Sequence, residues 1–457
     1  MFDPVAAVQQ FIRYPSVSTD SRQRAGMEGA RDYIAGLLEK IGCCVSVLET
    51  DRHPVVLAVR EGRPEWPHLV IYGHYDVQPA DPLEAWRSPP FEPEVRDGRL
   101  YGRGAADNKG PMMVHIAGVA RALERNPSLP LRITFVIEGE EEIGSPSFAD
   151  ILQRHSDRLR GDFVLLSDTS SPSPEQLAIT TGLRGMVCLD IAVEGPRSDL
   201  HSGVHGGAVL NPVQALAALC ASLHDADGWV DVPGFYDRVV GARAWEREEI
   251  AKLGSDDSDY LELLGAPAFH TVDGLRPGAA TRLMPTLEFN GIGGGYQGEG
   301  SKTIIPSRAF AKVSCRLVPE QDPVEIEEQL IRTLHERCSP KVRLSVHPGH
   351  RAAPYQVVPS GREGASSDIN PCLARAFDAA DRSIAEVFGK PPLYLREGGS
   401  IPIIAEVRRL LDMDSLMIGM FTPDNNVHAP DENLHLEMFE RGITVSARIV
   451  ESAGMAP

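Results

Sequence analysis

The chain has 457 residues, 42% of them hydrophobic and 24% charged, a composition typical of a soluble globular protein of two to three domains. Its formal net charge of −19 argues against a nucleic-acid-binding surface, because binding phosphates requires clustered cations. The N-terminus has no basic start followed by an apolar run, and no apolar stretch reaches the roughly 18–20 residues that span a bilayer. The seven cysteines are scattered without a Cys-x-x-Cys pair, which is typical of reduced thiols. We therefore expect a cytoplasmic protein that binds neither nucleic acid nor a membrane.

The first third of the chain alternates between helical and strand patterns. Helical periodicity is found in residues 4–14 and 26–41, and a further helix is predicted from about residue 111 to residue 126. The short apolar runs typical of buried strands are residues 55–59, 69–72, 131–137 and 163–166. Strands that alternate with helices predict an α/β domain with a mainly parallel sheet.

The middle of the chain predicts a second α/β unit, of two-layer type. Its predicted strands are residues 186–193 and 310–318, and its predicted helices are residues 208–224 and 323–338. The glycine-rich residues 291–300 are expected to be irregular, and the longer segment 254–300 and residues 355–368 are predicted to be loops on composition.

The helical pattern resumes near residue 370, and residues 416–420 predict one more core strand. We therefore predict that the chain leaves its first domain and later returns to it. The first domain then comprises residues 1–180 and 355–457, with residues 181–354 inserted as a second domain.

Two motifs lie next to predicted strands or helices in the first third of the chain. Residues 73–79, GHYDVQP, come directly after an apolar run, and His74 and Asp76 should point to the same side because side chains alternate along a strand. This is the strand end where open α/β sheets bind ligands, although a simple hydrogen-bonded pair explains the motif equally well. Residues 101–110, YGRGAADNKG, predict a tight loop with Asp107 just before a helix. Taken alone, Asp107 is more simply explained as a helix cap, and the spacing is not that of a phosphate-binding loop.

An acidic motif follows the run 131–137. Residues 138–145, EGEEEIGS, contain adjacent carboxylates that repel one another, and a divalent cation would offset this repulsion. Clustered carboxylates also raise one another's pKa, so that one of them can serve as a general base near neutral pH. The alternative is a solvated acidic loop, which is the common fate of charge clusters.

Two further segments present ligand-type side chains. Asp168 follows the apolar run 163–166, and His428 lies in the polar residues 425–433, NNVHAPDEN. Each signal is weak alone, but several strand ends and loops together deliver histidine or carboxylate groups to one edge of one sheet. Imidazole and carboxylate ligands suit zinc, with manganese or cobalt as alternatives, and a bridging carboxylate would create a two-metal site.

These segments, in this order, resemble the M20 family of metallopeptidases, and most closely its dipeptidase branch. The resemblance runs over nearly the whole chain. Three motifs in this order form the specific combination: HxDVQP, GRGxxDNKG and EExGS. The resemblance extends to DLHSGV at 199–204, IPSR at 305–308 and REGGSIP at 396–402. It implies a metal-binding catalytic domain and an inserted lid domain through which the family forms homodimers.

The resemblance also implies two divalent metal ions, most commonly Zn²⁺, with Mn²⁺ or Co²⁺ possible. His74 and Asp168 would hold one ion, and Glu142 and His428 would hold the other. Asp107 would bridge the two ions.

Other residues receive roles from the same resemblance. Glu141 would be the general base, and Asp76 would orient the ring of His74. The peptide bond between Asp107 and Asn108 would be cis. In the lid, His201 would reach the active site of the partner subunit and stabilise the oxyanion.

Substrate contacts are implied within the inserted domain and just after it. Arg316, at the end of a predicted strand, would bind the C-terminal carboxylate of the substrate, a task that suits the guanidinium fork. Thr303, Asn290 and Ser400 are weaker candidates for substrate contacts, and Asn290 could equally be a surface residue.

The implied activity is hydrolysis of the amide bond of dipeptides or similar small peptides by a metal-activated water. One alternative is an M20-type deacylase of N-acyl amino acids. Within the family, aspartate at the position of Asp168 goes with peptidases and glutamate with carboxypeptidases and deacylases, which favours the peptidase. An alternative of another class is a non-catalytic metal-binding or scaffold relative, which is disfavoured because the base and all five ligand positions are intact.

Overall fold

The computed structural model describes residues 2–253 and 258–455, which form two compact units. The first unit comprises Met1–Thr181, Val357–Leu395 and Pro402–Pro457, and the second comprises Gly182–Gln356 and Arg396–Ile401. The short segment Arg396–Ile401 thus belongs to the second unit, whereas the sequence placed it in the first domain. Among the described residues, no helix is both long enough and apolar enough to cross a membrane.

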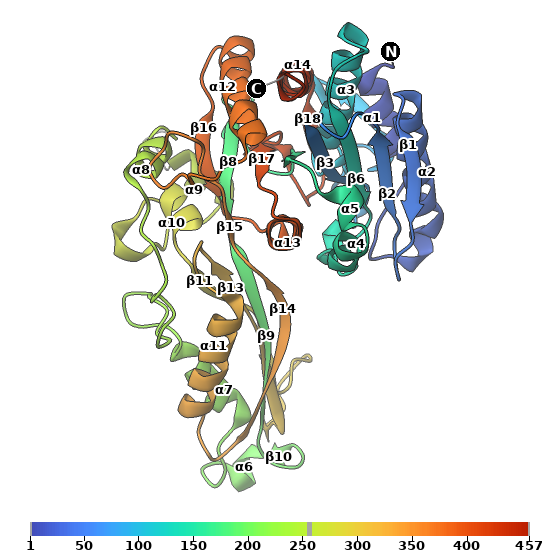
Figure 1. Ribbon diagram of the computed structural model, residues 1–457. Helices are drawn as coiled ribbons and strands as arrows, with labels where there is room; N and C mark the ends of the chain where they lie inside the picture. The colour runs from blue at the N-terminus through green and yellow to red at the C-terminus, as the bar shows by residue number, and fades with distance from the viewer. Residues whose placement is uncertain (1, 254–257, 456–457) are drawn as a thin grey trace. The chain divides into compact units, whose positions relative to one another are not determined.

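The first unit is built on a central β-sheet (Figure 1). Its strands, in spatial order, are β1 (Cys44–Leu48), β2 (Val55–Arg60), β6 (Arg132–Glu138), β3 (His68–His74), β7 (Phe163–Leu166), β17 (Ser415–Ile418) and β8 (Ala178–Leu183), and β16 (Leu393–Glu397) also pairs with β8. The four central strands β6, β3, β7 and β17 are parallel, and β2 and β8 flank them in antiparallel orientation. Every residue of β3 is buried, as expected for a strand covered on both faces. The predicted α/β class with a parallel central sheet is confirmed.

Helices cover both faces of this sheet. They are α1 (Pro4–Ile12), α2 (Arg24–Lys40), α3 (Lys109–Arg125), α4 (Phe148–Arg154), α5 (Ser156–Leu159), α12 (Pro371–Phe388), α13 (Pro402–Leu411) and α14 (Leu436–Ala453). On one face, Gly73 of β3 lies so close to Met112 of α3 that an added Cβ would be 2.7 Å from its sulfur. On the other face, the ring of Tyr72 contacts Phe148 of α4 at a centroid distance of 5.8 Å. Successive side chains of β3 therefore pack alternately against the helices on the two faces of the sheet.

A buried histidine joins α3 to α14 and should make stability depend on pH. The ring of His115 lies 3.0 Å from Ser446 Oγ and 2.9 Å from Ser167 Oγ, and burial lowers its pKa to about 3. The unfolded chain takes up this proton near pH 6.5, so folding stability is lost as the pH falls from 6.5 toward 3 and is unaffected by this group above 6.5.

Below pH 6.5, uptake of this proton by the unfolded chain lowers the free energy of unfolding by about 1.4 kcal/mol per pH unit. Between pH 7 and pH 5 we therefore expect the free energy of unfolding to fall by about 2 kcal/mol more in the wild type than in His115→Gln. Urea unfolding followed by circular dichroism at both pH values measures this difference. Equal losses in the two proteins would show that His115 does not titrate in this way.

The second unit contains a four-stranded antiparallel sheet. Its order is β11 (Thr286–Gly294), β13 (Arg308–Leu317), β9 (Gly185–Glu194) and β14 (Arg343–Ala352). Two helices, α7 (Pro212–Ala221) and α11 (Pro323–Arg337), pack against this sheet through an apolar core that includes Leu216, Leu330 and Val313. The remaining elements are α6 (Ser202–His205), α8 (Ala244–Ala251), α9 (Ser258–Leu264), α10 (Pro277–Leu283), β10 (Leu200–His201), β12 (Ile304–Ile305) and β15 (Tyr355–Gln356).

The loop predictions are wrong in part, and the predicted loop 355–368 begins with the strand β15. Residues 291–294 continue β11 and pair with β13, with a register irregularity between Phe289 and Gly291. The glycine at 293 leaves room for Phe310 of β13, whose ring would lie 2.6 Å from an added Cβ. The segment 254–300 also contains α9 and α10, while residues 254–257 lie outside the described part of the chain. Pairing with a distant strand is not visible in local composition, so a glycine-rich run was assigned to a loop.

Candidate metal centre

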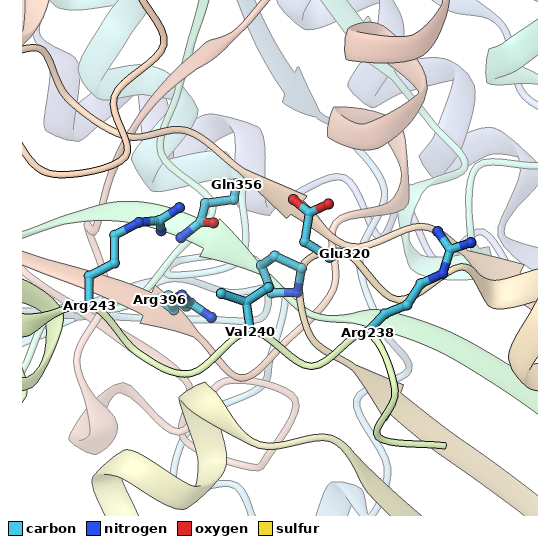
Figure 2. A pocket seen from close by; sticks show the side chains of 7 residues that line it. Arg238, Val240, Arg243, Glu320, Gln356 and Arg396 are labelled. Atoms are coloured by element: carbon cyan, nitrogen blue, oxygen red, sulfur yellow. The ribbon is translucent and has the colours of Figure 1, made fainter. Parts of the chain in front are cut away.

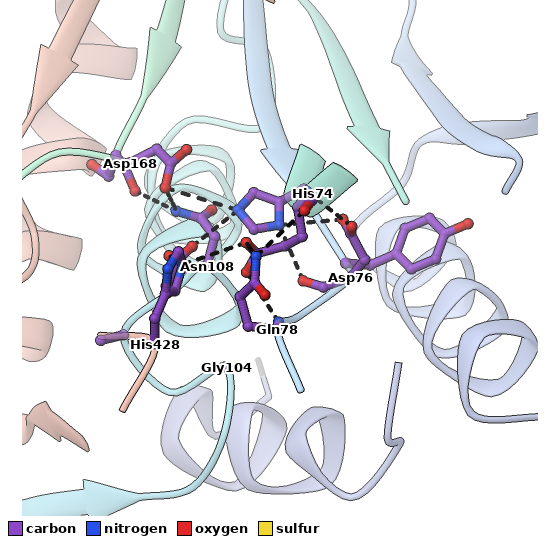
Figure 3. A network of polar contacts seen from close by, with 12 residues as sticks. His74, Asp76, Gln78, Gly104, Asn108, Asp168 and His428 are labelled. Carbon is purple, nitrogen blue, oxygen red and sulfur yellow. Dashed lines mark hydrogen bonds and ion pairs between the residues drawn. The ribbon is translucent and has the colours of Figure 1, made fainter. Parts of the chain in front are cut away.

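Six ionisable side chains of the first unit converge at the carboxyl ends of its parallel strands, and Figure 3 labels His74, Asp168 and His428 among them. His74 ends β3, Asp168 follows β7 by two residues, and Glu141 and Glu142 lie in a helical turn after β6. Asp107 lies in the loop before α3, and His428 lies in the loop before β18 (Asn433–His435). A small sheet in which β18 pairs with β5 (Arg99–Tyr101), and β5 with β4 (Glu94–Arg96), holds these two loops together.

The carboxylate of Asp107 lies at the centre of the cluster. Its Oδ1 is 3.1 Å from His74 Nε2, and its Oδ2 is 3.0 Å from His428 Nε2. On the first side, Asp168 Oδ1 lies 3.8 Å from His74 Nε2; on the second, Glu142 Oε2 lies 3.4 Å from His428 Nε2. Two groups thus form, each with one imidazole nitrogen and one carboxylate, and Asp107 contributes one oxygen to each.

This donor set fits two divalent metal ions. His74, Asp107 and Glu142 each offer one atom, and these atoms lie within 4.8 Å of one another. Nitrogen and oxygen donors of this kind suit zinc and its first-row neighbours. The geometry therefore brings together the five side chains for which the sequence predicted metal binding.

A second layer of hydrogen bonds orients these side chains. His74 Nδ1 donates to the Asp76 carbonyl at 3.1 Å and lies 3.4 Å from Asp76 Oδ1, while Asp76 Oδ2 accepts from the amide of Glu142 at 3.1 Å. Gln78 donates through Nε2 to Glu142 Oε2 at 2.8 Å. Asp76 therefore contacts one candidate ligand of each group, and such contacts fix the ring orientation and raise the basicity of metal-binding histidines.

Two residues of this second layer were missed by the sequence analysis. Gln78 lies in the quoted motif HxDVQP, and Asn108 follows Asp107 in GRGxxDNKG, so the signal was present but unassigned. Asn108 Nδ2 donates to Asp168 Oδ1 at 2.9 Å and to the Ser167 carbonyl at 2.8 Å, and Figure 3 shows Asn108 between Asp168 and His74. The Asp107–Asn108 peptide bond is cis, as the family resemblance implied.

The charges of the cluster are strongly coupled. Burial raises the pKa of Glu142 to about 7 and that of Glu141 well above its usual range. Hydrogen bonds to Asp107 and Glu142 raise the pKa of His428 to about 10. Burial alone would raise the pKa of Asp107, but hydrogen bonds from His428 and His74 outweigh it and lower that pKa. A divalent cation between these groups would favour neutral imidazoles and ionised carboxylates, so metal binding would release protons.

Candidate residues of the second unit form two separate groups. His201 of β10 pairs with Ile304 of β12, and the amide of Ser202 donates to the carbonyl of Thr303, the residue before β12, at 3.0 Å, so His201 and Thr303 lie close to each other. The exposed His201 ring accepts through Nδ1 from the amide of Gly203 at 3.0 Å.

The second group surrounds Arg316, which lies within β13. Its Nη1 donates to Ser400 Oγ at 2.9 Å, and Ser400 Oγ donates to the carbonyl of Arg184 at 2.5 Å. Arg184 was not predicted, and its Nε donates to the Gly398 carbonyl at 2.7 Å. Arg316, Arg184 and Asn290 all line a cavity of about 810 Å³.

A smaller cavity of about 340 Å³ in the second unit is lined by arginines that pair with carboxylates (Figure 2). Arg396 lines it and makes two hydrogen bonds of 2.7 and 2.9 Å to the buried carboxylate of Glu246, which also accepts from Gln356 at 3.1 Å. Arg238 at the other side pairs with Glu325 at 2.7 Å. The third arginine of the lining, Arg243, lies 3.8 Å from the same Glu246 carboxylate, so all three arginines face carboxylates and the cavity is not a candidate anion site. The Arg396–Glu246 pair instead fixes the segment Arg396–Ile401, and with it Ser400, to the second unit.

The chain belongs to peptidase family M20/M25/M40, because the sequence model of that family matches residues 70–452. It is 30% identical to the Cys-Gly metallodipeptidase dug1 of Schizosaccharomyces pombe, covering 99% of this chain and 96% of the relative. It is 32% identical to the human Beta-Ala-His dipeptidase, covering 93% of this chain and 82% of the relative. The solved structure of the M20 family metallo-carboxypeptidase Sso-CP2 from Sulfolobus solfataricus superposes with a TM-score of 0.87 at 29% identity, covering 99% of this chain and 100% of that one.

These matches confirm the resemblance seen in the sequence. They also confirm the expectation that the chain is an enzyme, a metallopeptidase of the dipeptidase branch.

Proposed function

We propose that the chain hydrolyses the amide bond of dipeptides with a water activated between two divalent ions. The observation that carries this proposal is the position of Asp107, whose two carboxylate oxygens face two separate histidine–carboxylate groups at 3.1 and 3.0 Å. Two divalent ions lower the pKa of a shared water and polarise the scissile carbonyl. His74 and Asp168 would hold one ion, Glu142 and His428 the other.

Glu141 takes the proton in this scheme. It accepts a proton from the attacking water and passes it to the leaving amine, a task that needs a carboxylate with a raised pKa. Burial and the neighbouring carboxylates Asp168 and Glu142 raise the pKa of Glu141, which supports this role. Asp76 keeps the ring of His74 oriented.

His201 donates to the oxyanion that develops on the scissile carbonyl. We assign it to the active site of a partner subunit, because its side chain is exposed and the M20 resemblance implies that the inserted domain forms homodimers. The catalytic unit is then a homodimer that assembles through the second unit. Thr303, directly before the strand that pairs with His201, would contact the same substrate.

Arg316, supported by Ser400 and with Asn290 nearby, binds the C-terminal carboxylate of the substrate. A guanidinium can hold a carboxylate by two parallel hydrogen bonds, which lysine cannot reproduce. We expect Arg316→Lys to lower kcat/KM for a dipeptide by about 10- to 100-fold, mainly through KM, since charge-assisted hydrogen bonds are worth roughly 1.5–3 kcal/mol.

The measurement compares a dipeptide with its C-terminal amide in wild type, Arg316→Lys and the control Lys312→Met. Lys312 lies four residues earlier on the same face of β13 and pairs with exposed Asp190 at 3.1 Å. Its replacement should therefore leave kcat/KM unchanged for both the dipeptide and its amide. Arg316→Lys should affect the free acid and leave the amide unchanged. An equal loss on both substrates would contradict the carboxylate-binding role.

Zn²⁺ is the metal we propose, with Mn²⁺ and Co²⁺ as alternatives, because two imidazoles and three carboxylates make up the donor set. We also propose a cytoplasmic location. All seven cysteines are free, including the exposed Cys44, which suits a reducing compartment.

The second candidate function is removal of a C-terminal residue from a larger peptide, which the similarity to a metallo-carboxypeptidase favours. A panel of dipeptides, tripeptides and N-acyl amino acids, assayed on Zn²⁺-loaded protein, separates the two. We expect dipeptides to be cleaved fastest. Cleavage of N-acyl amino acids without any cleavage of dipeptides would refute the proposal.

A further inference from the structure

Glu432 is a fully buried carboxylate that contacts the loop carrying Asp107. Its exposed fraction is 0%. Oε1 accepts from the amides of Ala106 and Asp107, both at 2.9 Å, and Oε2 accepts from the amide of Gly104 at 3.0 Å and from Arg103 Nη1 at 2.7 Å. Four donors thus surround one carboxylate, and three of them are backbone amides of the loop that ends at the proposed bridging aspartate.

The same residue belongs to the loop that carries His428. The amide of Gly102 donates to the Glu432 carbonyl at 2.9 Å, and the next residue, Asn433, pairs with Tyr101 between β18 and β5. Both side chain and backbone of Glu432 therefore connect the two loops. At the far side of this connection, His428 Nε2 lies 3.0 Å from Asp107 Oδ2.

The His428 loop needs such a support because its backbone is unusual. His428 has a φ of 62° and Asp431 a φ of 57°, in the left-handed region that residues other than glycine seldom adopt. Such conformations persist where the surrounding structure holds them in place. Glu432 directly follows Asp431 and supplies a buried anchor for the loop.

We propose that Glu432 is a positioning residue that sets the separation of Asp107 and His428. It thereby tunes the affinity for the metal ion that Glu142, His428 and Asp107 would hold. It touches neither the ions nor the substrate. The inference rests on the proposed two-metal function. Partners of metal ligands typically change metal affinity by about 10- to 100-fold when they are replaced.

Glutamine at this position cannot reproduce the contacts. All four partners of Glu432 are donors, so the NH₂ group of a glutamine would face either Arg103 and Gly104 or Ala106 and Asp107. The substitution also leaves the charge of Arg103, only 1% exposed, without its carboxylate, which lowers stability as well. A second variant, Glu432→Gln with Arg103→Met, removes the unpaired charge, but the NH₂ group of the glutamine still faces either Gly104 or the pair Ala106 and Asp107, whose amides lose their acceptor.

The control is Glu246→Gln. Glu246 is also a buried carboxylate held by a buried arginine, Arg396, but it lies in the second unit and contacts none of the proposed ligands. It should lose stability in a similar way without a change in metal affinity.

The experiment measures the dissociation constants of Zn²⁺ by competition with a chromophoric chelator at a temperature where each protein is folded. We expect both Glu432 variants to bind Zn²⁺ about 10- to 100-fold more weakly than wild type, and Glu246→Gln to remain within about twofold. Wild-type affinity in folded Glu432→Gln, or in the double variant if the single one does not fold, would overturn the inference. A wild type that binds fewer than two Zn²⁺ per chain would instead refute the proposed function itself.

Discussion

Replacing Glu141 by alanine abolishes hydrolysis and leaves both metal ions bound. The side chain is the proposed proton acceptor and is not among the five proposed ligands, so its loss removes proton transfer without removing the ions. General acid–base groups contribute about 10²- to 10⁴-fold to rates, and we expect a fall in kcat of at least about 10³-fold. Steady-state kinetics and metal analysis on the same preparation test this expectation. Hydrolysis near the wild-type rate would show that the base is another group.

The neighbouring Glu140 provides the matched control for this assignment. Its carboxylate is occupied by structural contacts, accepting from Thr50 Oγ1 at 2.8 Å, from the amide of His53 at 2.9 Å and from the amide of Ser147 at 3.1 Å. We expect Glu140→Gln to lower stability and to retain hydrolysis in the folded protein. If Glu140→Gln were inactive and Glu141→Gln active, the two neighbours would have been assigned in the wrong order.

Replacing Asp107 by asparagine removes both ions as well as activity. The asparagine presents one neutral oxygen where the carboxylate presents two charged ones, so one histidine–carboxylate group loses its shared ligand and the other keeps only an uncharged one. We expect less than one ion per chain after dialysis and a loss of kcat/KM of at least about 10³-fold, because both the activated water and the polarised carbonyl depend on the ions.

A variant at the edge of the cluster sharpens this result. His428→Ala removes a ligand from one group only, and we expect it to retain one ion, held by His74, Asp107 and Asp168. Metal content measured by mass spectrometry distinguishes the two variants. Two ions retained by Asp107→Asn would contradict its bridging position.

Much of the first unit could be predicted from local sequence. The buried run of β3 leads directly to His74, and the tight loop before α3 leads to Asp107, so each ligand could be placed at an element end. That the strand ends share one edge follows from the general rules of parallel sheets. The convergence of His74 and Asp168 therefore follows from the fold class, whereas the approach of the Asp107 and His428 loops depends on the pairing of β18 with β5.

The residues that were missed depend on contacts between distant parts of the chain. Glu432 accepts from Gly104 across 328 positions, and the acidic residue looked like one more polar group in a loop. Ser400 was assigned from a motif, but its segment belongs to the second unit because Arg396 pairs with Glu246, 150 positions earlier. Residues 291–294 became a strand through pairing with β13. No local pattern encodes which partner such a residue will find.

The central claim is that hydrolysis of dipeptides requires two ions per chain, and a metal titration tests it most directly. Metal-free protein is titrated with Zn²⁺, and bound metal and dipeptide hydrolysis are measured on the same samples. The two-metal site predicts no hydrolysis without metal and binding that saturates at two ions per chain, with full activity at that point. Hydrolysis by the metal-free protein, or full activity with binding saturated at one ion per chain, would contradict it.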